Sequence, residues 1–551
     1  MTGKREPAGD RRGDRRGRDR AGLRLGGGHD GDDGDDGDDG AGRAGRWLER
    51  ARAGLRRSAR LAVIAAKAVL LAAQAARSRA VRAGSRLAAG LRPAAGRAGR
   101  LRVQVSGALR AGPPRPLRAD AFRSPLRGPW LTAVLGLVLL GGLTVVAVTG
   151  LLSYAAYDPR LPGNDQTPGA RLLKFYLFPW PAGPDWLYRV NQGVHVTLGL
   201  ALLPVVLAKL WSVLPRLFAW PPARSPARIL ERLSLIMIVG GVLFEIVTGI
   251  LDIQNYYVFP FSFYTAHLYG AWVFIAGFAC HVLLKFGRMR AGLRSRSLRA
   301  ELRIPLALTR PEAAAAEAGS AAAAAKAGSA DSAESGDSAD SLRPADPARP
   351  TISRRGLLGA VAGASLTLAG LAVGQSIGGW TRWTALFGPR GTSAALSGIL
   401  PVNRTAAVIG LTDADVGPAY RLVLVGLHQV SLTREQVAAL PQRSAVLPIA
   451  CVEGWSTAAL WSGVRLTDLA RLAGVRDPAG AVVESIEQVG SFKMASLSAA
   501  QVTDPRSMLA LRVNGADLSR DHGYPARTII PAAPGVHNTK WVNKITFLAA
   551  A

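Results

Sequence analysis

A cysteine stands at the junction of an apolar run and a tight turn in the last third of this 551-residue chain. Residues 447–456 read Leu-Pro-Ile-Ala-Cys-Val-Glu-Gly-Trp-Ser, so Cys451 ends a strand-like segment and precedes a Glu-Gly turn. The other cysteine, Cys280, lies in an apolar segment far upstream, which argues against a disulfide between the two. Cys451 is therefore a candidate nucleophile, metal ligand or buried thiol, and its soft thiolate suits a thiophilic metal.

Further motifs surround Cys451 in the C-terminal region. They read Trp-Ser-Gly-Val-Arg-Leu at 461–466, Leu-Arg-Val-Asn-Gly at 511–515, His-Gly-Tyr-Pro-Ala-Arg at 522–527 and Pro-Gly-Val-His-Asn-Thr-Lys-Trp at 534–541. With the cysteine segment, and in this order, they resemble the molybdenum domain of the sulfite oxidase superfamily. The resemblance covers residues 400–547, and it implies that Cys451 binds molybdenum beside a pterin dithiolene.

The resemblance also implies a set of cofactor-binding residues. Lys540 and nearby backbone amides would hold the phosphate of molybdopterin, since an ammonium group and backbone N–H groups are suitable phosphate partners. Arg527 belongs to the same set, and a looser analogy adds Asn403 and Arg404. Taken alone, Arg527 and Lys540 would be ordinary solvated charges.

One position departs from the sulfite-oxidising members of the superfamily, which have an arginine four residues after the metal cysteine. Trp455 occupies that position here. Sulfite is a dianion that needs a cationic pocket, so this difference favours a resemblance to the reductase-type members, such as the methionine sulfoxide reductase catalytic subunit. We predict that Trp455, Tyr524 and His537 line the substrate pocket beside Cys451. Because His537 and Tyr524 are polar, oxidation of sulfite or a related anion remains an alternative.

Three histidines lie in long apolar segments, where ionisable side chains are costly and usually functional. His195 and His267 each stand near the expected outer end of a segment, so they share a depth in a helical bundle. Two imidazoles at one level can bind a haem between helices, and this region resembles four-helix membrane cytochromes of the haem-b type. The alternative is that each histidine makes a hydrogen bond within the bundle.

A third histidine lies deeper in the same bundle. His281 follows His267 by 14 residues, which is roughly 21 Å along a helix, so it cannot share a haem with His195. It is a possible ligand of a second haem, with Met237 as its partner. Glu245 is either a proton-handling or quinone-site residue or a hydrogen-bonded helix contact.

Charge and hydropathy place the chain in a membrane. Five apolar segments are long enough to span a bilayer, at residues 130–152, 192–214, 230–253, 264–286 and 356–379. The formal net charge is +30, and basic residues cluster in the first 128 residues and beside the apolar segments. This is the positive-inside pattern of a cell-membrane protein with a cytoplasmic N-terminus. Nucleic-acid binding is excluded, because it would need a recognisable basic motif on a folded surface.

The fifth apolar segment begins with an export-like motif. Ser-Arg-Arg-Gly-Leu-Leu at 353–358 resembles a twin-arginine signal, although it lies inside the chain. The alternative is a plain anchor helix with ordinary basic flanks. Beyond it, short β-branched runs alternate with Gly, Pro and short helical segments, which predicts a mixed α+β domain on the outer face.

The chain therefore divides into five expected parts. They are a disordered basic cytoplasmic extension (1–128), a four-helix haem-b membrane domain (129–290), a flexible cytoplasmic linker (291–352), the twin-arginine-like motif with a fifth membrane helix (353–379) and an α+β molybdopterin domain (380–551). The predicted protein is a membrane-bound molybdopterin oxidoreductase that passes electrons between haem, the membrane quinone/quinol pool and molybdenum. It would reduce a small-molecule or protein-bound S- or N-oxide. A second alternative is a non-catalytic membrane-anchored binding protein.

Overall fold

The computed structural model describes residues 122–165, 178–217, 226–312, 342–386 and 400–550, except for 257, 259, 260, 343, 345, 403, 489, 491 and 492. Almost all of the predicted N-terminal extension, residues 313–341 of the predicted linker, and Asn403 lie outside the described residues. The fold below therefore concerns the membrane segments and the C-terminal domain.

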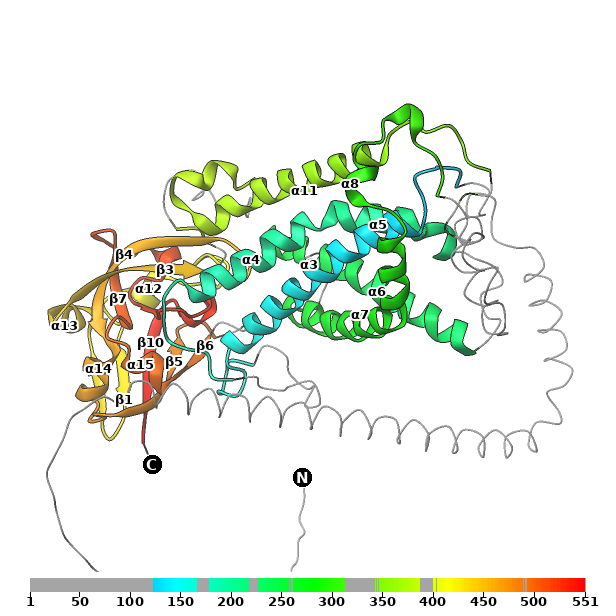
Figure 1. Cartoon of the computed structure of the whole chain (residues 1–551). Helices are drawn as coiled ribbons and strands as arrows, with labels where there is room; N and C mark the ends of the chain where they lie inside the picture. The colour runs from blue at the N-terminus through cyan, green and yellow to red at the C-terminus, as the bar shows by residue number, and fades with distance from the viewer. Residues whose placement is uncertain are drawn as a thin grey trace, which may run out of the picture. The chain divides into compact units, whose positions relative to one another are not determined.

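Five spans in the described chain are long and apolar enough to cross a membrane (Figure 1). They are α3 (Pro129–Ala156), α4 with α5 (Leu187–Ala201 and Leu203–Leu217), α6 (Pro226–Ile253), α7 (Phe263–Arg294) and α11 (Arg354–Ile377). The five predicted spans are confirmed, and α7 continues beyond its predicted end at residue 286.

The second span is interrupted between α4 and α5. Pro204 has no backbone N–H and its ring crowds the preceding turn, so regular helix is broken at Leu202. Leu202 N still donates to Leu198 O at 3.0 Å, and Val206 N donates to Leu202 O at 2.9 Å. The two helices therefore behave as one span, with His195 in its first half.

The start of α11 is fixed by a buried arginine of the twin-arginine-like motif. Arg354 is 2% exposed and forms an ion pair with Glu301 Oε2 at 3.2 Å. Its guanidinium also donates to the carbonyl oxygens of Pro125 at 3.1 Å and Arg310 at 2.8 Å. Arg355 is exposed. One arginine of the pair thus anchors α11 to the neighbouring segments, while the other faces outward.

The residues after α7 contain short helices and buried carboxylates. They form α8 (Leu298–Glu301) and the 3₁₀ helix η5 (Leu306–Leu308). Glu312 is buried and accepts a hydrogen bond from Trp130 N at 2.9 Å, which satisfies one of the unpaired backbone donors at the start of α3. This part of the predicted linker is therefore packed against the membrane helices.

The C-terminal domain is a mixed α+β fold, as predicted, and the structure shows that it is built on two five-stranded sheets (Figure 1). The first sheet has the order β2-β1-β10-β5-β6, from Gln429–Leu432, Leu422–Val425, Val542–Ala549, Pro478–Ser485 and Met494–Ser498. The second has the order β3-β4-β7-β8 with β9 also on β7, from Arg443–Ala450, Ser456–Arg465, Met508–Val513, Ala516–Asp517 and Arg527–Ile529.

Short helices connect these strands. They are η7 (Gly379–Thr384), α12 (Asp413–Val416), α13 (Arg434–Ala439), α14 (Leu466–Leu472), α15 (Ala499–Thr503), η9 (Arg520–His522) and η10 (Gly535–His537). Alternate residues of β1, such as Leu422 and Leu424, point into a core shared with α14. The cysteine segment lies in a second core cluster, under the other sheet.

Candidate functional site

Cys451 lies in the turn that joins two paired strands. β3 and β4 are antiparallel, and their last pair is Ala450 with Ser456. Cys451 N donates to Trp455 O at 2.9 Å, and Gly454 N donates to Cys451 O at 3.1 Å. Gly454 has φ +88°, a conformation that residues with a side chain rarely adopt. We call residues 451–454 the cysteine loop.

The Cys451 thiol is buried in a site that does not stabilise a free thiolate. Its side chain is 7% exposed and packs with Trp455 and Leu447. Burial raises the pKa of the Cys451 thiol well above its usual value, and the nearby Glu453 carboxyl acts in the same direction. A bound metal cation would reverse this effect, because it stabilises the deprotonated form.

A short bridge places the segment that precedes His537 beside Cys451. Ala450 pairs with Pro534 in parallel, and a Cβ added to Gly535 would lie 3.5 Å from Cys451 Cα. His537 is 1% exposed, and burial lowers its pKa to about 4, although Asp158 acts in the opposite direction. His537 is therefore neutral at pH 7.

Arg527 and Lys540 line the same part of the domain. Arg527 is buried and donates to His522 O at 3.0 Å and to Asn538 O at 3.1 Å. Lys540 Nζ donates to the carbonyl oxygens of Arg404 at 2.6 Å and Asp521 at 2.9 Å. Burial lowers the pKa of Arg527 to about 10 and that of Lys540 to about 7. Both cations are thus held by carbonyl groups in a poorly solvated region.

The remaining predicted residues lie around this region with different roles. The Arg404 guanidinium pairs with Glu487 Oε1 at 2.6 Å, while its carbonyl contacts Lys540. Tyr524 is half-buried at the edge of the Cys451 cluster, with the guanidinium of Arg434 over its ring at 4.8 Å. Arg434, the first residue of α13, therefore covers the Tyr524 ring.

Several buried polar groups near these residues fit a polar ligand. Within the described residues, Trp455 Nε1, Arg527 Nε, Asn538 Nδ2 and Thr539 Oγ1 are buried and have no hydrogen-bond partner. Such groups are costly unless something satisfies them. Across the described chain no three His, Cys, Asp or Glu side chains converge, so a metal held by Cys451 would need ligands from its own cofactor. A pterin that brings its own dithiolene and phosphate fits this set.

The membrane helices contribute to this site, and no sequence pattern had indicated it. Gln192 Nε2 of α4 donates to Val452 O at 2.5 Å, and Ser376 Oγ of α11 donates to Gly454 O at 2.7 Å. At the end of α3, the ring of Tyr157 lies 6.1 Å from that of His537. The cysteine loop and His537 therefore both contact the bundle.

The predicted pair of membrane histidines is brought together. The ring centroids of His195 and His267 are 6.3 Å apart, with the ring planes at 79°. His195 Nδ1 lies 3.0 Å from Val146 O, and His267 Nδ1 lies 3.1 Å from Glu245 Oε2. The Glu245 carboxyl thus lies beside His267, whose Nδ1 is also 2.8 Å from Thr248 Oγ1. Both histidines line a cavity of about 190 Å³, which we call the outer cavity, and Val452 of the cysteine loop lines it too.

His281 lies apart from this pair. It lines a second cavity of about 990 Å³, the inner cavity, between α3, α5, α6 and α7. Met237 is not among the described residues that line this cavity, and its backbone and Cβ pack against Gly277 instead. The predicted pairing of His281 with Met237 therefore gains no support from their positions.

The fold and this site define a class of protein: a bundle of helices long and apolar enough to span a membrane, joined to an α+β domain with one buried thiol. A family model described as an oxidoreductase molybdopterin binding domain matches residues 411–551. The chain is 34% identical over 162 residues to the uncharacterized oxidoreductase YuiH of Bacillus subtilis, covering 27% of this chain and 80% of that protein. The chain belongs to the sulfite oxidase family of molybdopterin oxidoreductases.

Two further relatives match the chain only in part. The mitochondrial sulfite oxidase of Drosophila melanogaster is 33% identical over 145 residues, which are 22% of this chain and 25% of that protein. The putative protein-methionine-sulfoxide reductase subunit YedZ1 of Azospira oryzae is 32% identical over 134 residues, which are 23% of this chain and 48% of that protein. The chain thus spans about a quarter and about half of the lengths of these two proteins. Membership of an oxidoreductase family counts against the non-catalytic alternative.

Proposed function

We propose that this protein is a membrane-bound molybdopterin oxidoreductase in which a haem b, supplied with electrons by membrane quinol, reduces a molybdenum site that reduces an S- or N-oxide. The observation that carries the proposal is the contact between the cysteine loop and α4. Gln192, which bonds to Val452, lies one helical turn before His195 on α4. The proposed haem ligand and metal ligand are therefore connected through one hydrogen bond, between Gln192 and Val452, at the edge of the outer cavity.

The geometry of the histidine pair supports a haem. If each imidazole nitrogen stood about 2 Å from an iron atom between them, the ring centroids would be about 6 Å apart, as they are for His195 and His267. Metal-bound histidines usually hold their other nitrogen with a carbonyl or carboxylate, and Val146 and Glu245 have these roles here. Nε2 of each ring is then the nitrogen that remains for iron.

Residues of the C-terminal domain fit the molybdenum cofactor. Bound here, the cofactor would supply a metal that exchanges an oxygen atom and two electrons with a substrate. The Cys451 thiolate would be its protein ligand. The Lys540 ammonium would hold its phosphate, and this ion pair would replace the hydrogen bonds of Lys540 to the carbonyl groups of Arg404 and Asp521. Arg527 keeps its contacts to two backbone carbonyls and holds the segment that carries Asn538 and Thr539 in place.

The charges near Cys451 support reduction of a neutral oxide. Glu453 and Asp252 both act on the Cys451 thiol as negative groups, and His537 is neutral at pH 7 because burial lowers its pKa. An acidic environment repels a sulfite dianion but tolerates an uncharged sulfoxide or N-oxide. Trp455, buried beside the cysteine, adds an apolar wall and one indole N–H donor. The substrate pocket thus suits a polar, uncharged acceptor of hydrogen bonds.

Oxidation of sulfite or a related anion is the second candidate. It is favoured by the 33% identity to a mitochondrial sulfite oxidase and by two basic side chains, the buried Arg527 and the half-buried Lys540. In that direction the electrons would run from the molybdenum site to haem and quinone.

We also propose that the N-terminus is cytoplasmic and the C-terminal domain lies on the outer face of the cell membrane. The support is the positive-inside pattern and the five candidate spans that the described residues contain before the domain, an odd number. A twin-arginine signal at Arg354 and Arg355 would allow the domain to be exported after it has folded around its cofactor.

A stopped-flow comparison of the two directions tests the function. Purified protein with dithionite-reduced haem is mixed with methionine sulfoxide, dimethyl sulfoxide or trimethylamine N-oxide, and protein with oxidised haem is mixed with sulfite. We expect at least one oxide to reoxidise the haem and sulfite to leave it oxidised. Haem reduction by sulfite with no response to any oxide would reverse the assigned direction.

A further inference from the structure

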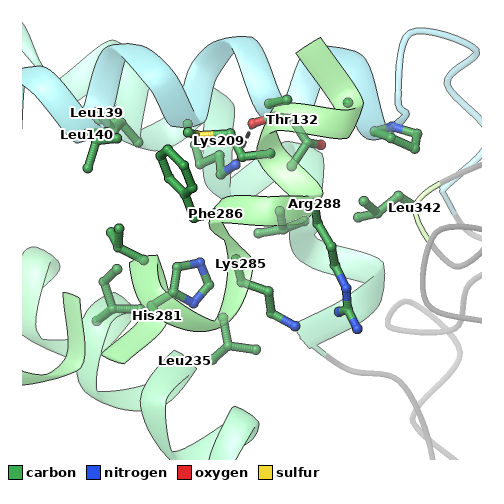
Figure 2. A pocket seen from close by; sticks show the side chains of 18 of the residues that line it. Thr132, Leu139, Leu140, Lys209, Leu235, His281, Lys285, Phe286, Arg288 and Leu342 are labelled. Carbon is green, nitrogen blue, oxygen red and sulfur yellow. Dashed lines mark hydrogen bonds between the residues drawn. The ribbon is translucent and has the colours of Figure 1, made fainter. Parts of the chain in front are cut away.

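A large cavity inside the helical bundle has no role in the function proposed so far. The inner cavity has a volume of about 990 Å³, at the upper end of the range for small-molecule sites. Most of its wall is apolar, including Leu139, Ile238 and Phe278. Figure 2 shows that His281 and Lys209 project toward it from different helices, near Lys285. The cavity is thus apolar along most of its length and polar at one end.

Three of the cations that line the polar end are engaged by other protein groups, while Arg288 on α7 is exposed. Lys285 forms an ion pair with Glu231, and Arg296 forms one with Glu301. Lys209 Nζ donates to Thr132 O at 2.5 Å, which Figure 2 marks. A ligand with a phosphate or carboxylate head would have to compete for these cations. A neutral head group that exchanges hydrogen bonds is a better match.

The inner cavity adjoins the outer cavity. Four side chains, those of Leu143, Val206, Val242 and Phe274, line both cavities, so a single layer of side chains separates them. The outer cavity holds His195 and His267. The apolar part of the inner cavity therefore adjoins the proposed haem site, while the polar end with His281 lies roughly 21 Å along α7 from His267.

We propose that the inner cavity is the binding site for an isoprenoid quinol, the electron donor of the enzyme. The apolar wall suits the isoprenoid chain and the polar end suits the ring with its two hydroxyl groups. This inference rests on the proposed function, because it needs a haem that accepts electrons. It adds to that function the location of the donor site and the residues that serve it.

The reaction at this site balances with the reaction at molybdenum. Oxidation of one quinol to quinone breaks two O–H bonds and releases two electrons and two protons. His281 and the carboxylates of Glu231 and Glu312 line the cavity and can accept protons. With haem and the molybdenum cofactor bound, the two electrons would be passed on to the S- or N-oxide, which takes up two protons to give the reduced product and water.

Two glycines of α3 provide a matched test. A Cβ added to Gly136 would lie 3.0 Å from Lys209 Nζ and 3.9 Å from Met289 Sδ, so a larger side chain there enters the inner cavity. A Cβ added to Gly141 would meet no atom within 4 Å. Gly136→Leu and Gly141→Leu thus make the same change in one helix, and only the first fills the cavity.

The experiment measures haem reduction in the purified full-length chain by ubiquinol-1 and, separately, by menaquinol-1. Gly136→Leu should slow quinol-driven reduction about tenfold or more, because overpacking weakens binding by such a factor. Gly141→Leu should stay within about twofold of the wild type, the usual range for exposed substitutions. His281→Gln should slow quinol oxidation and change its pH profile. The response to the two quinols identifies the preferred ring.

The outcomes separate this inference from the proposed function. Reduction by dithionite and reoxidation by a sulfoxide do not require the inner cavity, so both should be normal in Gly136→Leu. If those reactions work and Gly136→Leu accepts electrons from quinol at the wild-type rate, the quinol site lies elsewhere. Two haems per chain, with one lost in His281→Ala, would show that the cavity holds a haem instead and would also overturn the inference.

Discussion

The contact between Gly454 and α4 provides a quantitative test of how the two parts of the chain meet. A Cβ added to Gly454 would lie 2.8 Å from Val196 Cβ and from one of its methyl carbons. Carbon atoms normally pack about 3.5–4.0 Å apart, so the loop or the helix would have to move by about 1 Å. Gly454→Ala is therefore expected to disturb the contact and not only the turn.

The expected cost has two parts. Placing alanine at φ +88° costs about 1–2 kcal/mol, and the close contact with Val196 adds about 1–3 kcal/mol. Gly410 supplies a control for the first part, because it has φ +70° and a Cβ there would meet no atom within 4 Å. Gly410→Ala should thus destabilise the domain by only about 1–2 kcal/mol.

A double-mutant cycle with Val196→Gly isolates the contact. Val196 is buried, so its loss is destabilising alone, but in the Gly454→Ala background it also removes the clash. The cycle should give a favourable coupling of about 1–3 kcal/mol. Stability is measured by chemical denaturation in detergent, followed by the fluorescence of the tryptophans. If Gly454→Ala costs no more than Gly410→Ala and the coupling is zero, the cysteine loop does not rest on α4.

Three further predictions concern the haem, the phosphate site and export. His267→Ala, like His195→Ala, should abolish the low-spin haem spectrum while the chain still inserts into the membrane; a normal spectrum would rule out the pair. Burial lowers the pKa of Lys540 from 10.5 to about 7, so the unfolded chain binds more protons between these values. The free energy of unfolding of cofactor-free protein should therefore rise from pH 7 to pH 10, and Lys540→Met should flatten that rise. Arg355→Lys, which leaves the buried contacts of Arg354 intact, should keep the C-terminal domain protected from external protease, whereas full cleavage would refute twin-arginine export.

The sequence was sufficient to predict the elements whose signals are local. The spans follow from apolar runs of about 20 residues, and the turn at Cys451 follows from a strand-like run that ends in Glu-Gly. His195 and His267 could be paired because each stands near one end of its span, and helical rise converts that position into depth.

The contacts between distant segments could not be predicted. Gln192 and Val452 are 260 residues apart, and neither residue type indicates an interface between a membrane helix and a soluble domain. Arg354 stands in a motif that suggested an export signal, yet its side chain is buried against Glu301. Burial of a charged group depends on how the surrounding helices pack, and the residues next to Arg354 in the sequence do not indicate that packing.

The role of Cys451 as the molybdenum ligand is tested most directly by electron transfer from haem to substrate, measured in wild-type protein and in Cys451→Ser. Serine is close to cysteine in volume but is a harder and far less acidic metal ligand. We predict that the variant stays in the membrane and keeps the haem spectrum, since His195 and His267 lie outside the C-terminal domain. Its reduced haem should no longer be reoxidised by a sulfoxide, and its molybdenum electron paramagnetic resonance signal should change. A serine variant with the wild-type reoxidation rate and an unaltered molybdenum signal would show that Cys451 is not the molybdenum ligand.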